Sequence, residues 1–203
     1  MPTKPDDLET VQVESRADLR AWLAAHHATS PGIWLVTFKK AAGERHVGWD
    51  AIVEEALCVG WIDSKGLKVD AERTKLLLTP RKPRSPWSGS NKRRVEQLVA
   101  DGLMTRAGLA RIEAAEANGD WTVYDAAESL AVPDDLAAAL TATPGSQTAY
   151  DALTESKRKL LLAWVDTAKR PETRANRIAT LATGLPAGRN PLDWRAKQAS
   201  KPA

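Results

Sequence analysis

The residues best suited to chemistry lie in the segment 79–94, TPRKPRSPWSGSNKRR. This segment contains six arginines and lysines and no acidic residue, and Trp87 lies within it. Ser88 and Asn91 precede an apolar-periodic stretch, so we expect them at the positive N-terminus of a helix. Cations, hydroxyls and backbone N–H groups in this arrangement would suit phosphate, carboxylate or a nucleic-acid backbone. The alternative is a rigid, solvated surface loop in which Trp87 packs as an anchor.

Cys58, the single cysteine, is the next candidate and lies on a helix predicted over residues 50–60. A helical wheel places it opposite the apolar side, with Glu54 and Glu55 as neighbours. Because these carboxylates would raise the pKa of its thiol, an activated thiolate would need a cation from another element. The alternative is a small core residue. One cysteine also excludes an internal disulfide and a cysteine-based zinc site.

Two further charged residues could contact a ligand or a partner side chain. Asp63 lies in the segment WIDS, residues 61–64, where we expect the helix to give way to a strand. It is either a turn residue or a carboxylate that binds an arginine or a ligand. Arg174 lies in the apolar stripe of the last predicted helix, so it either extends its charged end to solvent, pairs with a buried carboxylate or lines a cleft. Asp63, Glu54 and Glu55 are the candidate partners, and such pairing would dock the C-terminal half onto the first.

Catalytic and metal-binding motifs are not evident in the sequence. The three histidines show no ligand spacing, and neither GxxxxGK[ST] nor GxGxxG occurs. No pair of base and nucleophile stands out, so the sequence assigns no reaction and leaves open whether the protein is an enzyme. We expect neither a metal nor a cofactor.

The elements that position these residues follow from hydrophobic periodicity. Strands are predicted at residues 10–13, 33–38, 65–69 and 74–78, and the last two form a hairpin. Helices are predicted after Ser15, over 50–60, after residues 88 and 105, from Pro133, around 160–165, and from Pro171 to Gly184. The pattern predicts an α+β fold: a small, mostly antiparallel sheet with helices in the N-terminal half, and a helical C-terminal module.

This organisation predicts four parts of the chain. Residues 1–14 form an N-terminal segment with a short strand, residues 15–122 an α+β domain, and residues 123–184 a helical module. Residues 185–203 are rich in proline, glycine and lysine, and we expect them to form a basic, disordered tail.

Composition and charge restrict the class of protein. The chain has 203 residues, 43% hydrophobic and 27% charged, which is typical of soluble globular proteins. Its net charge of +3 is small for a dedicated nucleic-acid-binding protein. The N-terminus has no apolar signal region, and no window approaches the roughly 18 apolar residues of a membrane span. We therefore expect a cytoplasmic protein, whose oligomeric state the sequence does not indicate.

Three blocks of the sequence, VEEALCVGWIDS, TPRKPRSPWSGSN and AKRPETRANRI, resemble the bacterial YdeI/OmpD-associated, or bacteriocin-protection, family. The resemblance extends over about residues 19–181. It implies that residues from about 132 to 184 form the C-terminal module of that family, and it includes Cys58 and adds Ser85 to the residues of interest. The family name implies a link to envelope stress or to resistance against antimicrobial peptides, without an established reaction.

Together, these observations predict a polar cleft between the two halves of the chain that binds a small anionic or peptide-like ligand. Its arginines would neutralise the anion, its polar side chains would donate hydrogen bonds, and its tryptophans would form flat walls. The predicted ligand-binding residues are Cys58, Trp61, Asp63, Arg81, Ser85, Trp87, Ser88, Asn91 and Arg174. One alternative is weak nucleic-acid binding through residues 79–94 and the basic tail, which would decrease steeply with salt. Another is a stress protein that binds a partner without a pocket.

Overall fold

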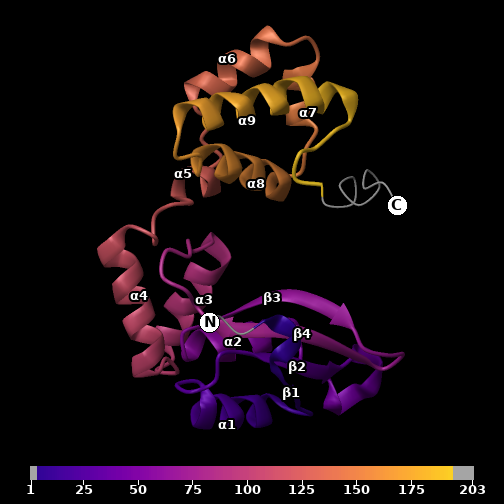
Figure 1. Cartoon of the computed structure of the whole chain (residues 1–203), viewed down its shortest axis with the longest axis vertical. Helices are drawn as coiled ribbons and strands as arrows, with labels where there is room; N and C mark the ends of the chain where they lie inside the picture. The colour runs from indigo at the N-terminus through magenta and orange to yellow at the C-terminus, as the bar shows by residue number, and fades with distance from the viewer. Residues whose placement is uncertain (1–3, 194–203) are drawn as a thin grey trace. The chain divides into compact units, whose positions relative to one another are not determined.

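The structure of the chain, a computed structural model, describes residues 4–193 and divides them into two compact units (Figure 1). The first unit ends at Thr122 and the second begins at Val123. The first contains a sheet and helices, whereas the described part of the second contains helices and no strand.

A four-stranded sheet organises the first unit. Its strands are β1 (Glu9–Gln12), β2 (Ile33–Phe38), β3 (Trp61–Lys68) and β4 (Arg73–Pro80), in the spatial order β1-β2-β4-β3. Every residue of β2 is buried, which its continuous apolar run predicts. β1 runs parallel to β2, whereas the β2–β4 and β3–β4 pairs are antiparallel. The predicted α+β fold with a mostly antiparallel sheet is confirmed, and the sheet is mixed because of the β1–β2 pair.

Two helices, α1 (Arg16–His26) and α2 (Trp49–Cys58), cover one face of this sheet. Ser15 caps α1 as predicted, because its hydroxyl accepts a hydrogen bond from the backbone N–H of Asp18 at 3.1 Å. The helices bury their apolar sides against alternate residues of β2 and β4. This core contains Val13, Leu19, Leu23, Ile33, Leu35, Val47, Ile52, Ala56, Val59, Trp61 and Leu78.

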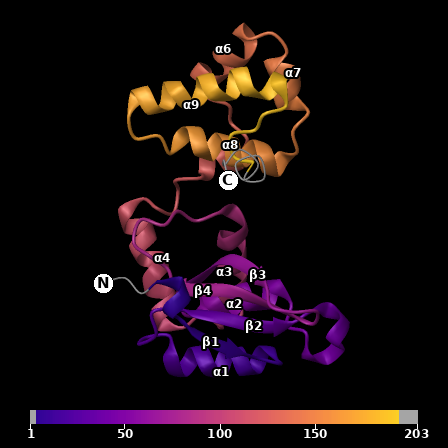
Figure 2. The same ribbon diagram turned by 45° about the vertical axis from the view of Figure 1, so that its right-hand side comes forward.

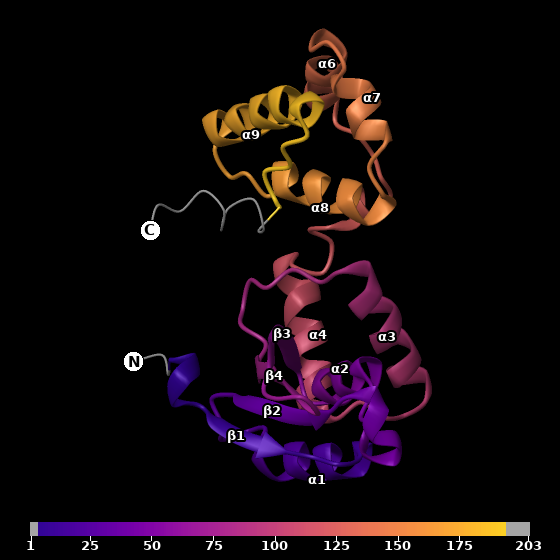
Figure 3. The same ribbon diagram turned by 90° about the vertical axis from the view of Figure 1, so that its right-hand side faces the viewer.

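Two further helices, α3 (Gly89–Ala100) and α4 (Arg106–Asn118), pack against α2 (Figure 3). A Cβ atom at Gly108 would lie 2.4 Å from the backbone oxygen of Cys58, so glycine permits the close approach of α4 to α2. The Thr105 hydroxyl donates a hydrogen bond to the same oxygen at 2.7 Å and accepts one from the Gly108 N–H. The second core formed in this way contains Val53, Leu57, Cys58, Trp87, Val95, Leu98 and Ala115.

Two short 3-10 segments that periodicity did not predict complete the first unit. They are η1 (Pro5–Asp7), before β1, and η2 (Lys40–Arg45), after β2. The indole N–H of Trp34 donates to the backbone oxygen of Pro5 at 2.8 Å. Because successive side chains of a strand point to opposite faces, this bond holds η1 on the sheet face opposite α1 and α2.

The described part of the second unit contains five α-helices: α5 (Asp125–Glu128), α6 (Asp134–Ala142), α7 (Ser146–Asp151), α8 (Glu155–Asp166) and α9 (Pro171–Gly184). α9 packs against both α6 and α8 (Figure 2). It begins at Pro171 and ends at Gly184, as predicted, because proline suits the first turn of a helix. No helix of the described chain is both long and apolar enough to cross a membrane.

The structure differs from the prediction of a disordered tail that begins at residue 185. A 3-10 segment, η3 (Leu185–Ala187), follows α9 directly. Leu185 is buried in the core of the second unit and Leu192 packs against that core, so apolar contacts extend this unit beyond α9. The rest of the predicted tail, residues 194–203, lies outside the described residues.

Candidate functional site

Arg81 is a buried residue of the basic segment, residues 79–94, and follows β4 directly. Its side chain and backbone together are 3% exposed, and its backbone N–H donates to the oxygen of Gly60 at 3.0 Å. The guanidinium carbon lies 3.8 Å from the ring centroid of Trp87, which is a cation–π contact. The same guanidinium donates to the backbone oxygens of Ser85 and Pro86. Arg81 therefore brings Ser85 and Trp87 together and fixes the loop between β4 and α3.

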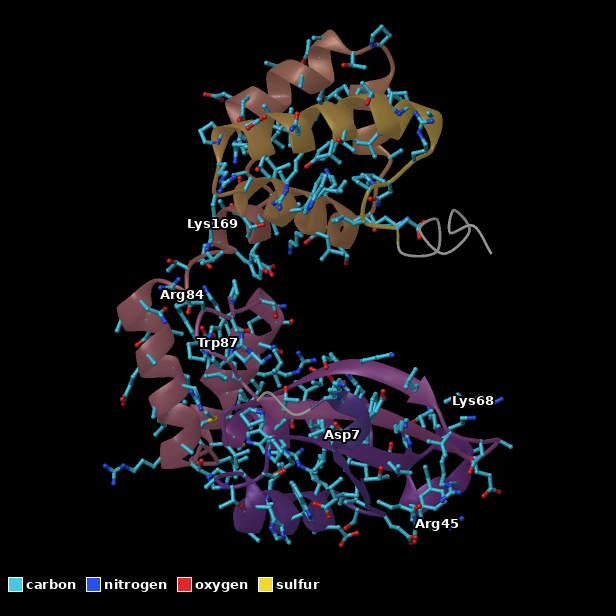
Figure 4. All side chains as sticks on the ribbon, viewed as in Figure 1. Asp7, Arg45, Lys68, Arg84, Trp87 and Lys169 are labelled. Carbon is cyan, nitrogen blue, oxygen red and sulfur yellow. The ribbon has the colours of Figure 1, made fainter. Side chains whose placement is uncertain are left out.

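Trp87 packs inside the first unit rather than along an open wall. It is 1% exposed, and its ring centroid lies 5.1 Å from that of Trp121. Its backbone N–H donates to the oxygen of Asp120 at 3.3 Å. Arg84, labelled with Trp87 in Figure 4, is one of the exposed residues of the same loop and has a φ of 60°. The buried indole offers no open face on which a nucleic-acid base or a ligand could stack.

Ser88 and Asn91 lie at the N-terminus of a helix, as expected. The Ser88 hydroxyl accepts a hydrogen bond from the Asn91 backbone N–H at 3.3 Å and lies 3.0 Å from the Ser90 hydroxyl. This geometry is that of an N-cap, in which the cap residue itself satisfies one of the free N–H groups of the helix. The Ser88 hydroxyl is thus used for capping α3.

Cys58 lies in the same core as Trp87 and is 5% exposed. Burial, together with the negative charge of Glu55, raises the pKa of its thiol to about 11. The thiol is therefore protonated at neutral pH, whereas thiolate chemistry would need a lowered pKa.

Trp61 and Asp63 lie within β3, because this strand begins at Trp61 rather than at residue 65. The Trp61 side chain is 1% exposed in the core beneath α1 and α2, and its indole N–H donates to the oxygen of His27 at 3.2 Å. Asp63 is half-buried, and its carboxylate accepts a hydrogen bond from the indole N–H of Trp49 at 3.1 Å. The carboxylate thus binds the side chain that begins α2.

Arg174 forms its ion pairs inside the second unit. Its guanidinium binds Asp135 at 2.6 Å and Asp166 at 3.1 Å, and the hydrogen bond that it donates to Asp135 is the main reason that its pKa is raised. The expectation that Asp63, Glu54 or Glu55 pairs with this arginine is therefore wrong. Asp135 on α6 and Asp166 on α8 lie beside Arg174 because both helices pack against α9. The spacing of these residues in the sequence does not reveal that packing.

Glu55 instead accepts hydrogen bonds from two arginines of α1. Its side chain is 2% exposed, and it binds Arg20 at 2.6 and 2.9 Å and Arg16 at 2.5 Å. Arg16 also pairs with Glu54 at 2.8 Å. Burial acts to raise the pKa of Glu55, but the hydrogen bonds from Arg20 and Arg16 outweigh it, so the pKa lies below its ordinary value. This network links α1 to α2.

A cavity of about 620 Å³ opens in the first unit beside the end of β4. Three cationic residues line it, Arg81, Lys82 and Arg111, together with the hydroxyl-bearing residues Ser64 and Thr79. The described residues that line the cavity include no acidic side chain. The rest of the lining is apolar and consists of Pro5, Leu8, Pro31, Leu77, Pro80 and Pro83.

The cavity contains Arg81 but not the other eight predicted ligand-binding residues, all of which lie in the described chain. The sequence did not predict that Ser64, Thr79, Lys82 and Arg111 would line one cavity together. The alternation along β4 was a usable signal for Thr79, since it places Thr79 and Arg81 on the same face. Arg111 gave no such signal, because only the packing of α4 against α2 brings it here.

Gly60 shows how Arg111 is positioned. Its φ is 77°, which favours glycine, and a Cβ atom there would lie 2.6 Å from Cγ of Arg111. The backbone oxygen of the same glycine accepts the Arg81 N–H. The turn between α2 and β3 therefore contacts both arginines of the cavity.

The fold is thus a small α+β unit with a cationic cavity, followed by a helical unit. Residues 11–111 match the model of a domain of unknown function, DUF8412. Residues 129–188 match the model of the family described as bacteriocin-protection, YdeI or OmpD-associated, which confirms the predicted resemblance for the C-terminal module. That match is narrower than the predicted range of residues 19–181. No curated protein and no solved structure matches the chain.

Proposed function

We propose that the first unit binds a small molecule with a phosphate or carboxylate group in the cavity around Arg81. The observation that carries this proposal is the cavity lining, which combines three cationic residues with two hydroxyls and, among its described residues, no acid. Charge-assisted hydrogen bonds from arginine are among the strongest that proteins make to such groups. A cavity of about 620 Å³ is also within the usual size range of small-molecule sites.

The contacts of Arg81 support a preformed site. Its stacking on Trp87 and its bonds to two backbone oxygens hold the guanidinium in place before a ligand arrives. A rigid cation loses little conformational entropy on binding, which increases affinity. Lys82 and Arg111 are exposed at the same cavity and would supply the more mobile cations.

We include peptides with a free C-terminal carboxylate in the ligand class. The family matched by residues 129–188 is described as one of bacteriocin protection, and this description supports a role in resistance to antimicrobial peptides. We extend the proposal to a role in envelope stress. In this proposal the first unit recognises the carboxylate, and no reaction is assigned.

Isothermal titration calorimetry with inorganic phosphate, acetate and a short peptide tests the proposal. We expect Arg111→Ala to weaken binding about tenfold, since one charge-assisted hydrogen bond is lost. Lys82→Ala should weaken binding less, because its exposed ammonium is well hydrated. Amidation of the peptide C-terminus should abolish binding of that ligand.

Arg106→Ala is the matched control, because Arg106 is an exposed arginine on the same helix that does not line the cavity. It should bind each anion as the wild type does. The proposal is wrong if Arg111→Ala and Lys82→Ala both retain the wild-type affinity, or if no anion binds.

A further inference from the structure

A second cavity, of about 430 Å³, opens at the other end of the sheet in the first unit. It lies between η2 and the start of α2 on one side and the sheet on the other. The sheet contributes the end of β2, the end of β3 and the beginning of β4, which lie near the β3–β4 turn. Val47, Ile52 and Leu76 line it, and the same three residues belong to or pack against the core beneath α1 and α2. The cavity is therefore an apolar groove that continues the core to the surface.

The groove exposes large apolar side chains that are held in place. Trp49 is 51% exposed, although its indole N–H is bonded to Asp63 and the Arg94 guanidinium lies 4.9 Å from its ring centroid. Leu67 on β3 is 36% exposed and lines the same groove. A fixed but exposed aromatic beside other apolar groups is a common feature of binding surfaces.

The charged residues that line the groove are all cationic, with His46 beside them. They are Lys39, Lys40, Lys68 and Lys75, and no acidic residue occurs among the described lining. The Lys75 ammonium lies 4.4 Å from the ring centroid of Trp34, on the sheet face opposite α1 and α2, so Lys39, Lys40 and Lys68 supply the charge at the rim. Lys39 donates to the backbone oxygens of Asp70 and Ala71 at 2.9 and 2.7 Å, contacts that leave its charge intact. Lys40 and Lys68 are exposed at the rim, and Figure 4 shows Lys68 at the end of the sheet away from Trp87.

We propose that this groove binds an amphipathic monoanion, a medium-chain aliphatic carboxylate, with its chain over the apolar floor and its carboxylate near the lysines of the rim. The apolar floor would bind the aliphatic part of the ligand. The rim, which carries lysines and no acidic residue among its described lining, would bind the carboxylate. The volume of about 430 Å³ suits a single small molecule. This site shares no lining residue with the cavity around Arg81, so the inference does not depend on the proposed function.

Calorimetry and tryptophan fluorescence with decanoate, octanoate and decanol, each below its micelle concentration, test this inference. We expect decanoate to bind more tightly than octanoate, by about fourfold for each additional methylene that is buried. Decanol should bind more weakly than decanoate, because it lacks the charge. Trp49→Phe should remove most of the fluorescence change and leave the calorimetric binding in place.

The charge reversal Lys40→Glu with Lys68→Glu isolates the role of the rim. It should weaken decanoate binding at least tenfold and leave decanol binding unchanged. Lys157→Glu with Lys169→Glu is the control with the same net charge, since both lysines are exposed in the second unit. It should bind decanoate as the wild type does.

Three outcomes would overturn the inference. The first is equal decanoate affinity in the wild type and the rim variant. The second is competition by phosphate or loss of decanoate binding in Arg111→Ala, which would assign the carboxylate to the cavity around Arg81. The third is binding of an acidic peptide, or self-association of the chain, at this groove without any binding of decanoate.

Discussion

At the scale of single residues, the charge of Glu55 has the clearest effect on the stability of the fold. Its carboxylate is buried, and both of its oxygens accept hydrogen bonds from arginines of α1. The arginines remain partly exposed, with side chains that are 38% and 54% accessible, so they stay hydrated if Glu55 is lost. The ionised form of Glu55 therefore stabilises the α1–α2 pair, and its neutral form does not.

We expect Glu55→Gln to lower the free energy of unfolding at pH 7 by about 2 kcal/mol, the size of a lost charged hydrogen bond. The folded-state pKa of Glu55 lies below its ordinary value of 4.5, so its contribution is complete above that pH. The contribution is lost as the pH falls through the folded-state pKa. Urea unfolding at pH 7 and at a series of lower pH values below 4.5 measures both effects.

Glu54→Gln is the control for this prediction, because Glu54 is more exposed and pairs with Arg16 alone among the described residues. It should cost less than about 1 kcal/mol. A Glu55→Gln variant that is as stable as the wild type at pH 7, or whose deficit does not shrink as the pH falls progressively below 4.5, would contradict the account of Glu55.

At the scale of elements, the approach of α4 to α2 decides where the cavity forms. Gly108 allows the backbones to meet, and Thr105 bonds to the Cys58 oxygen at the end of α2. Gly60, two residues beyond Cys58, makes room for Arg111 of α4. The position of one cation of the cavity is thus set by the contact between two helices.

Gly108→Ala tests this contact. In an exposed helix this substitution would stabilise by roughly 1 kcal/mol, because alanine has the better helix propensity. Here the added Cβ meets backbone that must move, so we expect destabilisation by about 1–3 kcal/mol, measured by urea unfolding. Gly66→Ala is the control: its Cβ would lie 3.8 Å from Leu76, an ordinary contact, and it should change stability little.

Local sequence signals predicted most elements of the fold but few residues of the cavity. The cap at Ser15, the apolar run of β2 and the proline that begins α9 are each determined by neighbouring residues, and the structure has them where expected. The cavity depends on residues more than forty positions apart in sequence, such as Ser64 and Arg111, whose proximity arises from packing. The tryptophans of the basic and WIDS segments were expected to form walls, but their size makes them core residues.

At the scale of the whole molecule, the two units have separate cores and separate family matches. The net charge is only +3, yet the first unit has two cavities with cationic linings that contain no acid among the described residues. The distribution of charge therefore says more about binding than the total does. The proposed anion site belongs to the first unit, and the second unit is where the bacteriocin-protection family matches.

The most direct test of the anion site is a titration of the nitrogen-15-labelled full chain with inorganic phosphate, followed by backbone amide NMR. The account predicts that the largest shift changes occur around Ser64, Thr79, Arg81 and Arg111, and that Arg111→Ala reduces them while Arg106→Ala does not. Shift changes centred on residues 88–91 at the start of α3, or no saturable changes at all, would contradict it.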